Sequence, residues 1–219
     1  MKFLLYVSVF LVIFGALDLD AADEAQPVSP TSSAKGVETI VFIRHGEKPA
    51  KEIGQLNCQG LNRALALPRV LTAKFGKPDY IFAPAPYRMS AAVGSFNYIR
   101  PLATIEPTAI ELGMPVNTDF GYTDIDGLRL ELTSKKYEHA LIFVAWEHHE
   151  LETVVKQLVR QFGGDPKVVP KWESDDFDSI YIVRVSNGKA AKSASFMRDQ
   201  EGLDNLSTDC PDPKHLTSQ

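Results

Sequence analysis

The chain alternates short apolar runs with longer stretches in which apolar residues recur every three or four positions. Three continuous apolar runs predict buried strands, at 38–43 (ETIVFI), 79–83 (DYIFA) and 140–146 (ALIFVAW). Helical spacing at 61–75 and 150–162 predicts an amphipathic helix after the first and the last of these strands. Pro68 predicts a kink or a break in the earlier helix, and Gly76 predicts its end.

The segments between these elements have weaker patterns. They predict a short helix at 89–99, a short strand at 103–107, a helix at 121–137 and a β-hairpin at 179–196 whose turn is Asn187-Gly188. Strands that alternate with helices favour crossover connections and therefore parallel pairing. The sequence thus predicts an α/β fold, a three-layer α/β/α sandwich with a mainly parallel central sheet and a C-terminal hairpin.

The N-terminal region differs in composition from the rest of the chain. Lys2 precedes an apolar stretch that is too short to span a bilayer comfortably, which predicts a signal peptide over 1–22 and leaves an uncleaved anchor as the alternative. A polar Pro/Ser-rich linker over 23–37, a domain over 38–200 and a tail over 201–219 follow. We expect an exported protein, secreted or periplasmic, without a stable membrane span after cleavage.

The 219-residue chain contains two cysteines, Cys58 and Cys210. A single pair in an exported protein predicts a disulfide between the tail and the domain, and two unpaired thiols are the alternative. The formal net charge is −5 and no Lys/Arg-rich face stands out, which argues against a nucleic-acid partner. The sequence leaves the oligomeric state open.

Unusual polar residues follow three of the predicted strands. Arg44-His45-Gly46-Glu47 follows the first strand, Arg88 comes shortly after the second, and Glu147-His148-His149-Glu150 follows a later one. The carboxyl ends of parallel strands share one rim of a sheet, where α/β proteins bind ligands. Guanidinium groups match phosphate oxygens, and a neutral imidazole can attack phosphorus. The rim is therefore predicted to bind a phosphoryl group.

A metal site is the competing interpretation of the same rim. Its plausible ligands are His45, Glu47, His148, His149 and Glu150. Two arginines at the rim would repel a divalent cation. We therefore expect neither a metal nor another cofactor.

The sequence RHGE at 44–47, an arginine after the second strand, and WEH at 146–148 resemble the histidine phosphatase superfamily, which has the phosphoglycerate mutase-like fold. The smaller, mutase-like branch is the closer match, because Lys48 and His149 depart from the acid phosphatase pattern. The resemblance implies that His45 is the phosphorylated nucleophile. It also implies that Arg44, Arg88 and His148 complete the phosphate pocket.

The general acid that protonates the leaving group is left open by this resemblance. In the mutase-like branch it is often a glutamate downstream of the second arginine, where Glu106 and Glu111 lie, and Glu147 and Glu150 are further candidates.

The predicted phosphate pocket is compatible with three functions. The first is a phosphatase that hydrolyses small phosphate monoesters, the second is a phosphomutase with the same intermediate, and the third is an anion-binding module without turnover.

One further expectation separates two adjacent histidines. The apolar residues of the helix after the last apolar strand define an inward face, and this face includes His148. His149 is rotated by about 100° around the helix axis and points away from the sheet. His148 is therefore predicted to serve the site.

Overall fold

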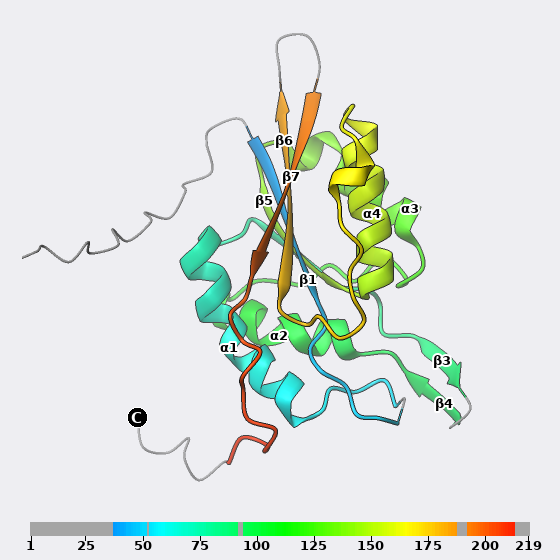
Figure 1. Cartoon of the computed structure of the whole chain (residues 1–219), viewed down its shortest axis with the longest axis vertical. Coiled ribbons are helices and arrows are strands. Elements are labelled where there is room, and N and C mark those ends of the chain that lie inside the picture. The colour runs from blue at the N-terminus through cyan, green and yellow to red at the C-terminus, as the bar shows by residue number, and fades with distance from the viewer. Residues whose placement is uncertain (1–36, 52, 92–93, 188–191, 213–219) are drawn as a thin grey trace, which may run out of the picture.

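The computed structural model describes residues 37–212 except 52, 92–93 and 188–191 (Figure 1). The predicted signal peptide, most of the linker and the hairpin turn lie outside the described residues. The elements in chain order are β1 (Val37–Arg44), α1 (Cys58–Phe75), β2 (Tyr80–Phe82), β3 (Arg88–Ala91), β4 (Gly94–Asn97), α2 (Arg100–Leu112), α3 (Ile125–Leu132), η1 (Lys135–Tyr137), β5 (Leu141–Trp146), α4 (His148–Gln161), η2 (Pro166–Val168), β6 (Ser179–Asn187) and β7 (Lys192–Gln200).

A five-stranded sheet with the order β2-β5-β1-β6-β7 forms the centre of the molecule. β1 and β2 both pair in parallel with β5, whereas β6 runs antiparallel to β1 and to β7. In the parallel pairing of β1 with β5, Arg44 lies opposite Trp146, so the two strands end together. This common end is the rim at which the sequence predicts the site.

Helices cover both faces of the sheet, with α1 and α2 on one side and α3 and α4 on the other (Figure 1). Successive residues of β1 point to opposite faces, because side chains alternate along a strand. Ile40 and Phe42 belong to the core beneath α3 and α4, and Val41 and Ile43 belong to the core beneath α1 and α2. All four are fully buried. The predicted three-layer sandwich is confirmed: β1, β2 and β5 form its parallel core, and β6 and β7 of the predicted hairpin add antiparallel strands.

Two of the weaker predictions are wrong. The segment 89–99 is not a helix, because it contributes β3 and β4, which pair with each other antiparallel. Gly94, the first residue of β4, has a φ of 113°, a conformation that L side chains rarely adopt. The segment 103–107 is not a strand, because α2 runs through it from Arg100, with Pro101 in its first turn. Proline suits the first turn of a helix because its missing N–H has no partner there anyway.

Helix α1 is continuous through Pro68, so the predicted break does not occur there, and it ends at Gly76 as predicted. It begins at Cys58, capped by the Asn57 side chain, which accepts a hydrogen bond from the N–H of Gly60 at 2.8 Å. A Cβ on Gly60 would lie 2.3 Å from the carbonyl oxygen of Glu47. The first turn of α1 therefore packs backbone to backbone against the loop that follows His45.

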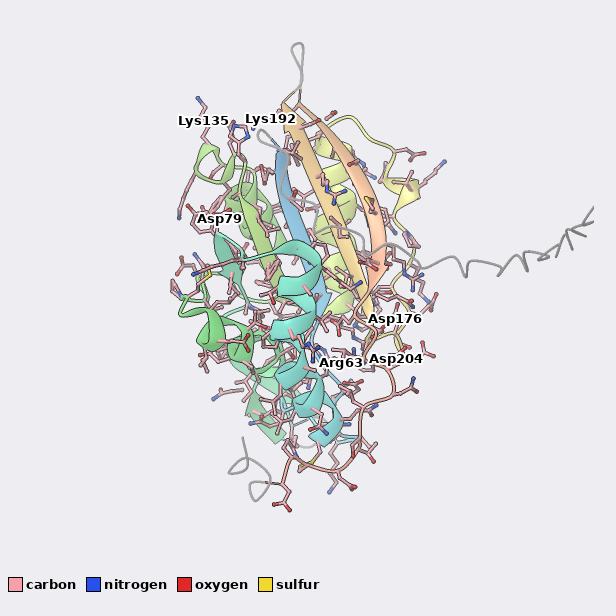
Figure 2. The ribbon with its side chains drawn as sticks, turned by 90° about the vertical axis from the view of Figure 1, so that its left-hand side faces the viewer. Arg63, Asp79, Lys135, Asp176, Lys192 and Asp204 are labelled. Atoms are coloured by element: carbon pink, nitrogen blue, oxygen red, sulfur yellow. A yellow bond between two sulfur atoms is a disulfide. The ribbon has the colours of Figure 1, made fainter. Side chains whose placement is uncertain are left out.

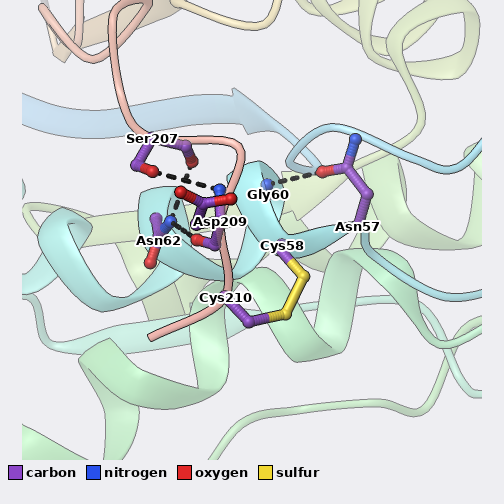
Figure 3. Close-up of a disulfide and its surroundings, with 7 residues drawn as sticks. All are labelled: Asn57, Cys58, Gly60, Asn62, Ser207, Asp209 and Cys210. Atoms are coloured by element: carbon purple, nitrogen blue, oxygen red, sulfur yellow. Dashed lines mark hydrogen bonds between the residues drawn. A yellow bond between two sulfur atoms is a disulfide. The ribbon is translucent and has the colours of Figure 1, made fainter. Parts of the chain in front are cut away.

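The tail after β7 returns along α1 and is tied to it covalently. Cys58 and Cys210 form the predicted disulfide across 152 positions of sequence (Figure 3). Beside it, the side-chain amide of Asn62 donates to the carbonyl oxygens of Ser207 and Asp209, both at 2.8 Å. A disulfide is typical of an oxidising compartment. Among the described residues, no helix has both the length and the apolar character needed to cross a bilayer.

Candidate active site

Arg44 closes β1 and is held rigidly beneath the rim. Its side chain is 1% exposed. The Nη1 atom donates to the carbonyl oxygens of Ser174 at 2.9 Å and Asp176 at 2.8 Å, and the guanidinium lies 3.8 Å from the centre of the Phe177 ring. Burial lowers the pKa of Arg44 to about 10, so the group stays charged at neutral pH. A fixed, buried guanidinium is well suited to bind an anion.

His45 follows Arg44 and is 2% exposed. Its Nδ1 lies 2.8 Å from the carbonyl oxygen of Gly46. Because a carbonyl oxygen only accepts hydrogen bonds, Nδ1 carries the proton and Nε2 keeps its lone pair. The N–H of Gly46 in turn donates to Oγ1 of Thr104 at 2.9 Å, which fixes this loop against α2. The imidazole is thus oriented as a nucleophile through Nε2.

The charge state of His45 supports the same role. Burial and, to a smaller extent, the positive charges of Arg100 and Arg44 lower its pKa to about 3, against the opposing effect of the hydrogen bond to Gly46. The imidazole is therefore neutral throughout the physiological pH range. A neutral imidazole flanked by two cations is what attack on a phosphate dianion requires.

Arg100 is a site residue that the sequence analysis missed. It is the first residue of α2, is 6% exposed, and places its guanidinium 4.6 Å from the centre of the Tyr98 ring. Arg88, the predicted second arginine, begins β3 opposite Asn97, and its side chain lies outside what the structure describes. Among the described arginines, Arg44 and Arg100 act electrostatically on His45. Recognising Pro101 as a residue of the first turn of a helix would have pointed to Arg100 as the start of that helix.

His148 and His149 occupy the positions that helical spacing predicts. His148 is 8% exposed and faces inward at the start of α4, whereas His149 is exposed. The Nδ1 atom of His148 lies 2.5 Å from Oε1 of Glu147. The ring thus lies beside this carboxylate just after the end of β5, at the same rim as His45. The predicted orientation is confirmed, and the role of His148 in phosphate binding stays a prediction.

Glu147 is engaged as the N-cap of α4. Its Oε2 accepts hydrogen bonds from the N–H groups of His149 at 2.8 Å and Glu150 at 3.0 Å. Burial alone would raise its pKa, but the contact with His148 and these N–H groups outweigh burial and lower the pKa to about 2. An ionised carboxylate has no proton to donate, which argues against Glu147 as the general acid.

The other candidate acids differ in their distance from the rim. Glu106 and Glu111 are both exposed on α2. Glu111 lies eleven positions after Arg100, about 16 Å along the helix axis, so the fold does not bring it to the site. Glu150 is half-buried in the first turn of α4, and burial, then repulsion by Glu147, raises its pKa. Glu150 is thus the candidate whose surroundings favour a protonated carboxyl.

Two of the residues that the metal hypothesis names, His148 and His149, lie close to Glu147. Single donor atoms of Glu147, His148 and His149 are within 4.8 Å of one another. Such a set can hold a metal ion, but Oε2 of Glu147 is already used by the helix N–H groups. Removing metals from the protein distinguishes the two interpretations.

A buried ion-pair cluster supports the loop after His45 and was also missed. Arg63 of α1 is fully buried and contacts Glu47 at 2.7 Å, Glu201 at 2.5 Å and Asp178 at 3.2 Å. Asp204, beside Arg63 in Figure 2, adds a more exposed contact at 3.3 Å. Glu47 is two residues from His45, so the cluster connects the nucleophile loop to the C-terminal tail.

Comparison with solved structures identifies the fold. A structure named as a phosphohistidine phosphatase SixA from Nakamurella multipartitia matches with a TM-score of 0.51 and 15% identity, covering 75% of this chain and 96% of its own. A phosphoglycerate mutase from Plasmodium falciparum matches with a TM-score of 0.49 and 12% identity, covering 81% and 98%. A phosphoserine phosphatase from Entamoeba histolytica gives 0.47 and 12%, covering 77% and 99%.

These proteins belong to the superfamily that RHGE and WEH resemble, and the chain has their phosphoglycerate mutase-like fold. No protein-family model matches the sequence. No curated protein matches it by sequence either. At this level of identity the comparison establishes the fold, and the chemistry must be argued from the site itself.

Proposed function

We propose that the protein is a phosphatase that hydrolyses small phosphate monoesters through a phosphohistidine on His45. The observation that carries the proposal is the state of this imidazole. It is buried and neutral, its Nδ1–H donates to the carbonyl oxygen of Gly46, and it lies within the electrostatic reach of Arg44 and Arg100. The names of the structural neighbours, two phosphatases and a phosphoglycerate mutase, are consistent with this chemistry.

In the first step Nε2 of His45 attacks phosphorus, a P–N bond forms, and the P–O bond to the leaving group breaks. Arg44, Arg100 and His148 would bind the phosphoryl oxygens, whose negative charge they stabilise in the transition state. In the second step water attacks phosphorus and the P–N bond breaks. The water loses a proton to solvent or to a neighbouring base, phosphate is released, and neutral His45 is regenerated. We propose Glu150 as the acid for those leaving groups that need a proton.

The test is covalent labelling combined with turnover. The purified protein, incubated with a ³²P-labelled monoester and quenched in alkali, should carry an acid-labile label on a peptide that contains His45. The variant His45→Ala should retain the fold by circular dichroism, carry no label and lose hydrolysis to background. Substantial hydrolysis by His45→Ala would exclude the covalent mechanism.

An anion-binding module without turnover is the second candidate. One observation favours it: the carboxylate closest to His148 is ionised and engaged as a helix cap. In that case vanadate would bind tightly while no monoester is hydrolysed and no label forms. A phosphomutase would instead form the label but pass the phosphoryl group to a second substrate rather than to water.

The disulfide and the apolar N-terminal segment together support an exported protein, secreted or periplasmic, which would meet its substrate outside the cytosol. Fractionation of the native host tests this proposal. Recovery of the mature chain from the cytosolic fraction with free thiols would contradict it.

A further inference from the structure

Three tyrosines from separate segments meet beside the nucleophile. The N–H of Tyr98 donates to the carbonyl oxygen of Tyr87 at 2.9 Å, which places the two residues opposite each other at the base of the β3–β4 ribbon. Tyr122 contacts both of them. Its ring is stacked on Tyr87 at 5.4 Å between centroids with an interplanar angle of 17°, and it lies 5.2 Å from the Tyr98 ring. We call Tyr87, Tyr122 and Tyr98 the tyrosine ladder.

The ladder leads from solvent to the nucleophile. Tyr87 is 37% exposed, Tyr122 is half-buried and Tyr98 is 1% exposed. At the inner end, the Tyr98 ring meets the His45 ring edge-on, with 6.1 Å between centroids and an angle of 86°. On another side of His45, the Phe177 ring lies at 6.2 Å. The phosphoryl site is thus bordered by aromatic rings, and one row of them continues outward.

The outer rings are held in place by the framework of the site. The indole Nε1 of Trp146, the last residue of β5, donates to the carbonyl oxygen of Tyr122 at 2.8 Å. This bond ties Tyr122 to the strand end that also carries His148. Tyr87 is fixed through its backbone bond to Tyr98. The ladder therefore keeps a defined position relative to His45, as a specificity element requires.

We propose that the tyrosine ladder is the subsite for the leaving group, and that the substrates are phosphate monoesters of planar aromatic alcohols. The inference rests on the proposed function of His45. A phosphoryl group beside His45 lies at the inner rung, and a leaving group that extends toward solvent passes Tyr122 and Tyr87. Aromatic rings attract one another beyond the effect of their buried area, so a planar π-system gains most from this wall.

The protonation state of the carboxylate beside His148 is compatible with substrates whose leaving group needs no proton. Glu147, the carboxylate beside His148, caps α4 with its Oε2 atom. A phenol has a pKa of about 10, far below that of an alkyl alcohol, so a phenolate can leave without being protonated. An aryl ester therefore needs a proton neither from Glu147 nor from Glu150, the acid proposed above for poorer leaving groups.

Two non-hydrolysable ligands test the inference independently of turnover. Phenylphosphonate and cyclohexylphosphonate carry the same anion and a ring of similar size, but only the first presents a π-face. Calorimetry should show that the wild-type protein binds phenylphosphonate about two- to tenfold more tightly. Tyr87→Phe should keep this preference and Tyr87→Leu should lose most of it. Because Tyr87 is partly exposed, both variants are expected to fold, which circular dichroism checks.

The outcomes separate the two proposals. Equal affinities in the wild-type protein, or a preference that persists in Tyr87→Leu, would overturn the role of the ladder. Turnover of phenyl phosphate and cyclohexyl phosphate is measured in parallel. If neither ester is hydrolysed but the preference for phenylphosphonate is lost in Tyr87→Leu, the role of the ladder in binding is supported and the proposed phosphatase function is refuted. If both esters are hydrolysed and the two phosphonates bind equally, the phosphatase function is supported and the role of the ladder is refuted.

Discussion

Replacing Arg100 with alanine is expected to weaken binding of vanadate, a phosphate mimic, far more than replacing Arg88. Arg100 is buried at the start of α2 and its charge lowers the pKa of His45, so it lies where the anion is expected. A hydrogen bond from a charged donor contributes about 1.5 to 3 kcal/mol, which corresponds to roughly 10- to 150-fold in the dissociation constant. With only 6% of the residue exposed, solvent screens this interaction little.

The assay is inhibition of monoester hydrolysis by vanadate, with the direct calorimetric affinity as a second readout. The variant Arg100→Lys is the matched control, because it keeps the positive charge but loses the planar guanidinium fork and its stacking on Tyr98. We expect Arg100→Lys to fall between the wild-type protein and Arg100→Ala. Thermal unfolding of each variant shows whether a loss reflects binding rather than folding.

The comparison with Arg88 decides between two assignments of the second arginine. Arg88 begins the β3–β4 ribbon, and the sequence alone predicts it as the phosphate ligand. A larger loss of vanadate affinity in Arg88→Ala than in Arg100→Ala would refute the assignment to Arg100. It would also imply that the ribbon, rather than the start of α2, delivers the second charge to the pocket.

Four further predictions concern the histidine pair, the disulfide, a buried acid and metals. His148→Ala should lower kcat by orders of magnitude while His149→Ala costs much less, and a kinetic comparison giving the opposite ranking would reassign the inward residue. Replacing both Cys58 and Cys210 with alanine should lower the free energy of unfolding in urea, by up to about 4 to 5 kcal/mol in the chain-entropy model, and an unchanged value would show that the tail is held without the disulfide. Burial raises the pKa of Glu38 from 4.5 to about 7, so the stability that its bound proton contributes is present below pH 4.5 and lost as the pH rises through 7. Glu38→Gln should therefore raise the melting temperature relative to wild type more at pH 8 than at pH 5, and equal shifts at both pH values would contradict the shifted pKa. Dialysis against a chelator should leave hydrolysis unchanged, and a loss that zinc restores would support a metal at the rim.

The local sequence pattern was sufficient to predict a helix or strand wherever that element buries one of its faces in the core. The apolar runs at 38–43 and 140–146 form β1 and β5, and the periodicity of 150–162 correctly placed His148 inward and His149 outward. These patterns need no knowledge of distant residues, because burial against the sheet determines them. The predicted ends of these strands also placed Arg44 and His45 at the rim of the sheet.

Prediction failed where distant residues decide the structure. The segment 89–99 has a composition that suits a helix, but it forms a ribbon in which β3 pairs with β4 and the N–H of Tyr98 donates to the carbonyl oxygen of Tyr87. With that error the start of α2 was misplaced, and Arg100 was overlooked. The contacts of Arg63 could not be predicted either, since its partners Asp178 and Glu201 lie 115 and 138 positions away. Nothing in the sequence near Arg63 distinguishes it from an ordinary helix arginine.

The partners of two buried arginines explain why they have opposite roles. Arg63 contacts the carboxylates of Glu47, Asp178 and Glu201, which compensate its charge, so it holds the nucleophile loop and the tail together. Arg44 donates instead to main-chain carbonyl oxygens, which orient a guanidinium without carrying a net charge of their own. These hydrogen bonds thus leave the charge of Arg44 without a carboxylate partner, although Glu147, Asp176 and Glu47 act on it electrostatically, and its orientation is fixed before a ligand arrives. Preorganised charge of this kind stabilises a transition state without reorganisation, and this is the physical reason to expect catalysis at His45 rather than binding alone.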